Sequence, residues 1–131
     1  MRVAITGANS GIGLRAVRRF AESGADVIAL SRSRERGELA IATLQPEARA
    51  RVRLVELDLA SPVSIAGAAE TVVADGPLDV LINNAAVFDL SAREARFTET
   101  GQELFWATNH LGPTEFTARV SGALAAAPSP R

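Results

Sequence analysis

Three glycines near the start of the chain could bring a phosphate group against bare backbone. They occupy positions 7, 11 and 13, between a short apolar run and a helical pattern. A helix N-terminus carries unpaired N–H groups and a partial positive charge, and a turn without side chains lets a pyrophosphate approach it. The same spacing could also serve only to pack a helix against a strand. The glycines alone leave both interpretations open.

Three kinds of side chain that do covalent or acid–base chemistry are absent: cysteine, tyrosine and lysine. There is no cysteine, which excludes disulfides and thiolate metal ligands. There is no tyrosine, and all 14 basic residues are arginine, so two common proton donors are absent as well. His110 is the single histidine, and no carboxylates lie around it at metal-binding spacing. The sequence also lacks the Gly-x-Ser-x-Gly motif that would suggest a hydrolase. We therefore expect no metal site.

Length and charge indicate one domain without a polymeric partner. At 131 residues the chain is long enough for a single compact domain, residues 1–131, and too short for two. Its formal net charge is −1 and the charged residues are spread along it, so we expect no nucleic-acid partner. The apolar runs are short and no charged leader opens the chain, so we expect no membrane span, no signal peptide and a cytoplasmic location.

Apolar patterning predicts four strands that alternate with helices. The strands span residues 3–6, 25–31, 51–57 and 78–83. The helices span residues 11–23 and 34–44, a stretch from Ser61-Pro62 to just before Gly76-Pro77, and residues 101–126 with an interruption at Gly112-Pro113, after a loop over 87–99. Each crossover is long enough for a helix, so the strands are expected to be parallel. The pattern is typical of a Rossmann-type, doubly wound α/β fold, which binds ligands at the carboxyl ends of its strands.

Three further motifs follow the glycine turn in a set order. The turn reads TGANSGIG at residues 6–13, and after it come LDL at 57–59, NNAA at 83–86 and NHLG at 109–112. Together they resemble the short-chain dehydrogenase/reductase family, whose first turn reads Thr-Gly-x-x-x-Gly-x-Gly. The wording of the first and last motifs is most similar to retinol-dehydrogenase-like reductases that prefer NADP. The chain ends where that family would enter a fifth strand, so it resembles the front part of such a domain.

The resemblance implies a cofactor contact at several positions of these motifs. The phosphates would lie on the first turn, the adenine ring after the third strand and the nicotinamide ribose after the fourth. The implied contacts are Gly7, Ser10, Gly11, Ile12, Gly13, Asp58, Leu59, Asn84 and Ala85. Asn83 is expected to stabilise the sheet instead of touching the cofactor. Ala86 stands where the family usually has glycine, which adds a methyl group close to the cofactor.

The end of the second strand indicates which dinucleotide is bound. A carboxylate there would pair with the ribose 2′-hydroxyl and repel a 2′-phosphate, and the chain offers Ser31, Arg32 and Arg34 instead. These arginines could also form only a solvated helix start. We expect NADP instead of NAD, with Arg32 as the phosphate contact, because a guanidinium can hold a phosphate through two hydrogen bonds.

The catalytic half of the resembled family is missing from this chain. Family members protonate the developing alkoxide with a tyrosine, assisted by a lysine four residues later and by a serine after the fifth strand, and the chain contains neither tyrosine nor lysine. Only Asn109 of that set remains, and it is expected to support a water-linked proton relay. His110 is expected to be a packed structural residue, and Phe105 and Trp106 to lie in the core or in an interface.

Two functions stay open at this point. In the first, the chain belongs to an NADP-dependent oxidoreductase that moves a hydride to or from a carbonyl or alcohol of a small molecule. In the second, it is a non-catalytic NADP(H)-binding or interaction protein. In both, the edge of the fourth strand and the apolar residues Leu104, Leu111 and Phe116 of the last helix are expected to be exposed and to favour a homo-oligomer.

Overall fold

A parallel four-stranded sheet forms the centre of the molecule. The computed structural model describes residues 1–89 and 91–131. The strands are β1 (Arg2–Thr6), β2 (Asp26–Ser31), β3 (Val52–Glu56) and β4 (Val80–Ile82), arranged in the order β3-β2-β1-β4. All three pairings are parallel. The predicted Rossmann-type α/β fold is confirmed, and the order of the strands reverses between β1 and β4, where such sheets bind ligands.

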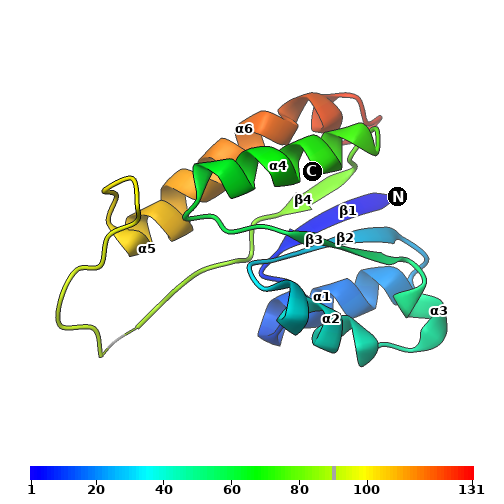
Figure 1. Cartoon of the computed structure of the whole chain (residues 1–131). Coiled ribbons are helices and arrows are strands. Elements are labelled where there is room, and N and C mark those ends of the chain that lie inside the picture. The colour runs from blue at the N-terminus through cyan, green and yellow to red at the C-terminus, as the bar shows by residue number, and fades with distance from the viewer. Residues whose placement is uncertain (90) are drawn as a thin grey trace.

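Helices cover both faces of the sheet (Figure 1). On one face lie α1 (Gly11–Glu22), α2 (Arg34–Ala42) and the short α3 (Pro46–Arg49). On the other face lie α4 (Pro62–Ala74) and the last helical segment, which consists of α5 (Leu104–Trp106), η1 (Ala107–Leu111) and α6 (Gly112–Ala125). The long connection from β4 to α5 extends away from the sheet at its carboxyl edge (Figure 1).

Alternating side chains of the strands feed two separate cores. Val3 and Ile5 of β1 pack with Val17 of α1, whereas Ala4 between them packs with Val72 of α4 and Phe116 of α6. The neighbouring strand β2 alternates in the same way. Successive strand residues point to opposite faces, so a strand covered on both faces is apolar throughout. This accounts for the continuous apolar runs in the sequence.

The predicted starts of α2 and α4 agree with the observed caps. The hydroxyl of Ser61 accepts the N–H of Ser64 at 3.4 Å, with Pro62 at the first helical position of α4. Ser33 caps α2 in the same way. The short helix α3 was not predicted; it begins at Pro46, because proline suits the first turn of a helix.

The last helix differs from the prediction at its start and in its middle. Gly101 has a φ of 78° and lies in a turn, so the helix begins at Leu104 instead of residue 101. Gly112 is fully helical, with φ −61° and ψ −50°, and the predicted break at Gly112-Pro113 is wrong. A π-helical turn, η1, directly precedes Pro113, which has no N–H to donate to the preceding turn.

The expected exposure of the last helix is only partly correct. Phe116 is 0% exposed, because α6 packs against α4 and over the sheet, so the prediction that it faces solvent without a partner is wrong. Leu104 is half-buried and Leu111 is 36% exposed. No helix among residues 1–89 and 91–131 is long and apolar enough to cross a membrane.

The edge of β4 is shorter than predicted and partly covered. Leu78 leaves the strand, since its N–H donates to Ala123 of α6 instead of joining the ladder. On the outer side of β4, the N–H of Arg131 donates to Asp79 and the carbonyl of Arg131 accepts from Leu81, both at 2.9 Å. A residue of a parallel strand bonds in this way to the two neighbours of the residue opposite it, so Arg131 pairs with β4 opposite Val80. The unpaired edge is therefore shorter than expected from the sequence, and Arg131 covers part of it.

Candidate nucleotide-binding site

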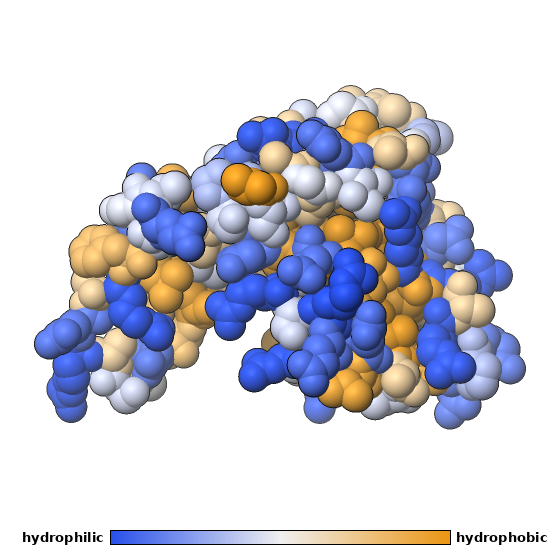
Figure 2. Space-filling model, in the orientation of Figure 1, coloured by the Kyte–Doolittle hydropathy of each residue, from blue (hydrophilic) through white to orange (hydrophobic). Residues whose placement is uncertain are grey.

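An open cleft of about 890 Å³ lies at the carboxyl ends of the strands. Figure 2 shows the molecule hollowed here, between the connection that leads to α5 and the body formed by the sheet with α1 and α2. Every cofactor contact implied by the sequence lines this one cleft: Gly7, Ser10, Gly11, Ile12, Gly13, Ser31, Arg32, Asp58, Leu59, Asn84 and Ala85. Residues more than seventy positions apart in the sequence thus meet at one place.

The glycine turn leaves the start of α1 open to the cleft. Gly7 and Gly11 have φ values of 66° and 53°, a backbone conformation that favours glycine. Ser10 is the N-cap residue of α1, but its side chain makes no capping hydrogen bond. The first N–H groups of the helix and the Ser10 hydroxyl are therefore free to bind an anion. Ile12, in the first turn, has an apolar side chain that is 79% exposed toward this space.

Gly13 permits the closest approach between the helix and the sheet. A β-carbon at this position would lie 2.6 Å from the side-chain nitrogen of Asn84 and 2.9 Å from the carbonyl carbon of Gly7. Neither neighbour can move freely, because one is backbone and the other is hydrogen-bonded to Thr6. The third glycine of the turn is thus required by space alone.

Thr6 ties β1 to the segment after β4, a role that the sequence motifs did not predict. Its hydroxyl accepts the N–H groups of Asn84 and Ala85, both at 3.0 Å. In return, the side-chain amide of Asn84 donates to the carbonyls of Thr6 at 2.9 Å and Gly7 at 3.3 Å. These bonds hold the floor of the cleft next to the glycine turn. The position of this threonine, directly before the first glycine of the turn, was the one feature of the sequence that could have indicated its role.

Asn83 and Ala86 flank the residues that form the floor of the cleft. Asn83 does not line the cleft, and its side chain donates to the Thr117 hydroxyl on α6 at 3.0 Å, in keeping with its expected structural role. Ala86 does line the cleft and is exposed, so its methyl group faces the space that the glycine of the family would leave free.

The loop after β3 forms the wall at one end of the cleft. Asp58 Oδ1 accepts the N–H of Ala60 at 2.9 Å, and the Asp58 N–H donates to the Ser64 hydroxyl at 2.8 Å. These bonds hold the carboxylate in place while leaving its second oxygen available. Leu59 is 5% exposed beneath it. Thr108 of η1 also lines the cleft, a position that the sequence motifs did not identify.

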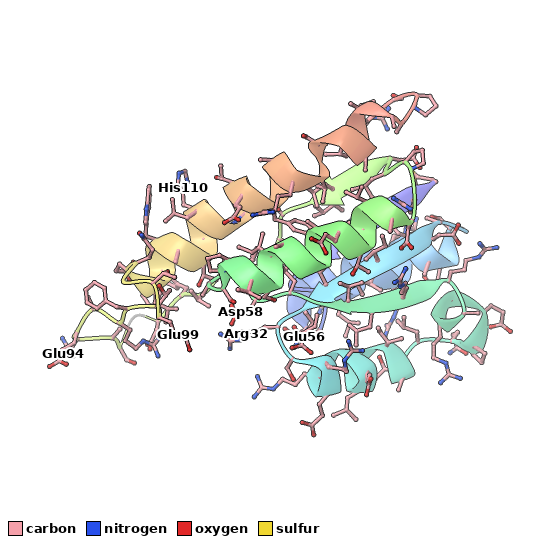
Figure 3. All side chains as sticks on the ribbon, turned by 45° about the horizontal axis from the view of Figure 1, so that its top comes forward. Arg32, Glu56, Asp58, Glu94, Glu99 and His110 are labelled. Atoms are coloured by element: carbon pink, nitrogen blue, oxygen red, sulfur yellow. The ribbon has the colours of Figure 1, made fainter. Side chains whose placement is uncertain are left out.

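Arginines lie at the rim beyond β2. Arg32 lines the cleft, and Figure 3 shows it at the same edge of the sheet as Asp58. Among the residues that the structure describes, no carboxylate lies within 4 Å of the Arg32 guanidinium. Arg34 does not line the cleft and faces Glu56 at 3.8 Å, whereas Arg36 does line it. The hydroxyl of Ser31 is used within the turn, where it donates to the Ser33 carbonyl at 3.0 Å.

Asn109 lies next to the cleft but does not line it. Its side chain forms two hydrogen bonds of 2.8 Å with the backbone of Val87, accepting the N–H and donating to the carbonyl. These two bonds hold the segment after β4 against η1. Val87 itself lines the cleft, so Asn109 acts on the site through its neighbour.

His110 points away from the cleft. It is exposed on the outer side of the last helix (Figure 3) and stacks on Trp106, with ring centroids 4.2 Å apart and planes inclined by 25°. The histidine is thus stacked but not packed in the core, and Trp106 is 52% exposed. No group of three metal-binding side chains occurs within residues 1–89 and 91–131.

Two carboxyl groups between β4 and the last helix have lowered pKa values because backbone and side-chain groups donate hydrogen bonds to them. The Ser91 hydroxyl and N–H donate to Asp89 and lower the pKa of that carboxyl. The N–H groups of Phe105 and Trp106 donate to Glu103 and lower its pKa in turn. Both carboxylates shape the segment between β4 and α6, and neither lines the cleft.

Comparison with known proteins identifies the family. The family model for short chain dehydrogenases matches residues 1–129. A short-chain dehydrogenase/reductase of Armillaria gallica is 36% identical over 129 residues, which cover 98% of this chain and 41% of that protein. The structure of menthone neomenthol reductase from Mentha piperita superposes with a TM-score of 0.82 at 26% identity, over 99% of this chain and 58% of that one.

A third match comes from a complex with cofactor. The short-chain dehydrogenase of Sphingobium yanoikuyae, solved with NADPH, superposes with a TM-score of 0.74 at 30% identity, over 92% of this chain and 47% of that one. The chain thus spans about two fifths of the Armillaria protein and about half of the Sphingobium one. From its cleft, its sheet order and these matches, the chain belongs to the short-chain dehydrogenase/reductase family and corresponds to the N-terminal portion of its members.

Proposed function

We propose that this chain binds NADP(H) and is the cofactor-binding portion of an oxidoreductase acting on a carbonyl or alcohol of a small molecule. The observation that carries the proposal is the single cleft in which the bare glycine turn, the Asp58 wall and the rim arginines face one another. The Sphingobium relative holds NADPH, and the Mentha relative is a reductase named for menthone. These two relatives support the proposal because they belong to the same family as this chain.

The pyrophosphate fits the start of α1. Three features favour an anion there: the uncapped N–H groups, the unused Ser10 hydroxyl and the positive end of the helix dipole. A side chain at Gly13 would fill this place, so the turn is shaped for close approach to backbone. The exposed Ile12 side chain gains an apolar neighbour once a cofactor lies across the turn.

The rim charges favour a 2′-phosphate. Arg32 and Arg36 both line the cleft beyond β2, with Glu35 as the one carboxylate between them in the sequence. Two guanidinium groups can share the oxygens of one phosphate, each through more than one N–H. We therefore assign the phosphate to Arg32, as the sequence predicted, and add Arg36 to the same subsite.

The nicotinamide end lies over Asn84, Ala85 and Val87. The bound cofactor supplies the hydride chemistry, and the protein contributes orientation and proton transfer. Thr6 and Asn84 hold the floor rigid, and Asn109 holds Val87. In this proposal Asn109 is a positioning residue that holds Val87 and does not itself relay a proton.

A second candidate is a cofactor-binding protein without catalysis. The observation favouring it is that the sequence holds neither tyrosine nor lysine, the residues that family members use for proton transfer. Both candidates predict that the 131-residue chain alone lacks the family's proton donor, so they agree on its turnover. The 131-residue chain mixed with NADPH and a panel of ketones and aldehydes is expected to consume NADPH at the background rate, whereas steady consumption would require a proton donor other than tyrosine.

Cofactor choice is tested with Arg32→Ala. A charge-assisted contact to the 2′-phosphate contributes about 1.5–3 kcal/mol, so the variant should bind NADPH roughly 10- to 150-fold more weakly and NADH unchanged. Arg34→Ala is the matched control, because Arg34 faces Glu56 and does not line the cleft. Calorimetric titration of all three proteins with both cofactors provides the measurement. Equal losses for NADPH and NADH in Arg32→Ala would contradict the assignment.

A further inference from the structure

The last helix and the loop after β3 touch backbone to backbone at Gly112. A β-carbon built on Gly112 would lie 2.8 Å from the β-carbon of Leu59 and 2.9 Å from its carbonyl carbon, and nearer still to its carbonyl oxygen. Gly112 is buried and its φ of −61° suits any residue. Glycine is therefore needed here for close approach and not for its conformational freedom.

This contact lies behind one end of the nucleotide cleft. Leu59 and its neighbour Asp58 form one wall of that end. Thr108, four residues before Gly112 on the same continuous helix, lines the cleft as well and is only 8% exposed. The distance between the helix and Leu59 therefore sets how far Thr108 lies from the Asp58 wall.

We propose that Gly112 is a positioning residue for the adenine ring of the cofactor. By letting the helix pack directly on Leu59, it holds Thr108 close enough to the Asp58–Leu59 wall for both to contact a flat ring between them. This inference rests on the proposed NADP(H) binding and extends it to a residue that contacts no cofactor itself.

A single methyl group at Gly112 would widen this end of the cleft. Ordinary β-carbon contacts begin at 3.4 Å, so the helix must move outward by on the order of 1 Å to accept one. A gap of 0.5–1 Å forfeits roughly a quarter to a half of the dispersion attraction between facing atoms. The adenine ring would then keep close contact with either Thr108 or the Asp58–Leu59 wall, but not with both.

The surroundings allow the helix to move without loss of the fold. The helix residues just before Gly112, at positions 109–111, are exposed. A helix displaced away from Leu59 therefore moves toward solvent, so Gly112→Ala is expected to shift the helix and not to prevent folding. A β-carbon added at Gly122, on the same helix, would meet nothing within 4 Å, which makes Gly122→Ala a matched control.

The test compares the wild type, Gly112→Ala and Gly122→Ala by calorimetric titration with adenosine 2′,5′-bisphosphate and with NADPH. The inference predicts a Kd at least 10-fold higher for both ligands in Gly112→Ala, with an unchanged number of binding sites. Gly122→Ala should stay within about twofold of the wild type. A residue that mattered only for folding would lower the number of competent sites and leave Kd as it was.

Each outcome decides the question. An unchanged Kd in Gly112→Ala, with or without a lower number of sites, overturns the inference while leaving NADP(H) binding intact. Absence of binding by the wild type overturns the proposed function and this inference with it. If Gly112→Ala does not fold, Thr108→Ala takes its place: weaker binding of the bisphosphate at full stoichiometry supports the role of this wall, and wild-type affinity overturns it.

Discussion

The hydroxyl of Thr6 accepts the N–H of Ala85 at 3.0 Å, across the two strands between which the sheet reverses its order. The same oxygen accepts the N–H of Asn84, which also reaches the Ile82 carbonyl at 3.1 Å. Thr6 is 1% exposed, so water does not replace these bonds. One buried hydroxyl thus joins the glycine turn to the floor of the cleft.

Thr6→Val should destabilise the protein because it keeps the shape of the side chain but removes this acceptor. The Ala85 N–H would be left without a partner, at a cost of about 1–3 kcal/mol in the free energy of unfolding. Chemical denaturation measures the change. Thr71→Val is the control, since the Thr71 hydroxyl donates to the Gly67 carbonyl one turn earlier in α4 and accepts no N–H across the sheet, as far as residues 1–89 and 91–131 show, and it should cost less than about 0.5 kcal/mol. Similar losses in the two variants would contradict this role of Thr6.

Asn109→Ala should loosen the segment after β4. The variant removes both hydrogen bonds to the Val87 backbone, and each contributes about 0.5–1.5 kcal/mol. Hydrogen exchange at the Val87 amide should therefore become at least several-fold faster. Asn83→Ala also removes a bond to the last helix, to Thr117, but leaves Val87 bonded, so its Val87 amide should exchange at the wild-type rate. Unchanged exchange in Asn109→Ala would show that the side chain does not hold this segment.

Lowering the pH should weaken the start of the last helix. The lowered pKa of Glu103 reflects hydrogen bonds from Phe105 and Trp106 to its charged form. The cap is fully present above the ordinary pKa of 4.5 and is lost as the pH falls through the lowered folded-state value, because the folded protein must then take up a proton.

Fluorescence of Trp106, the single tryptophan, reports this change directly. A transition below pH 4.5 is expected in the wild type and in Glu99→Gln, which alters an exposed carboxylate of the same connection. Glu103→Gln should lack the transition. A transition of the same size and midpoint in Glu103→Gln would assign it to another group.

Local patterns were sufficient to predict the four strands and most of the helices, whereas the family resemblance supplied most of the cleft residues. Apolar patterning, the serine caps and the glycine spacing depend on neighbours in the sequence, and the elements that they predicted are present apart from boundaries, the unpredicted α3 and the break at Gly112. The cofactor contacts that the resemblance implied line one cleft and stay predictions. Long-range pairing decided what was missed. The hydroxyl of Thr6 has a role only because β1 lies beside β4, and Thr108 lines the cleft only because the last helix packs on Leu59.

Two errors have the same physical origin. Periodicity shows that Phe116 belongs to an apolar face, but only the packing of α6 on α4 shows that this face is already covered. The sequence likewise led us to name Arg32 and Arg34 and to overlook Arg36. The start of α2 at Arg34 turns that residue toward Glu56 and leaves the other two at the cleft.

The most direct test of nucleotide binding is a calorimetric titration of the chain with NADPH, together with Gly13→Ala and Gly67→Ala. The wild type and Gly67→Ala, whose new β-carbon meets nothing within 4 Å, should bind one NADPH per chain. Gly13→Ala should bind at least tenfold more weakly, because its methyl group would collide with the Gly7 carbonyl and the Asn84 amide at the pyrophosphate site. No binding by the wild type, or equal binding by Gly13→Ala, would contradict the account.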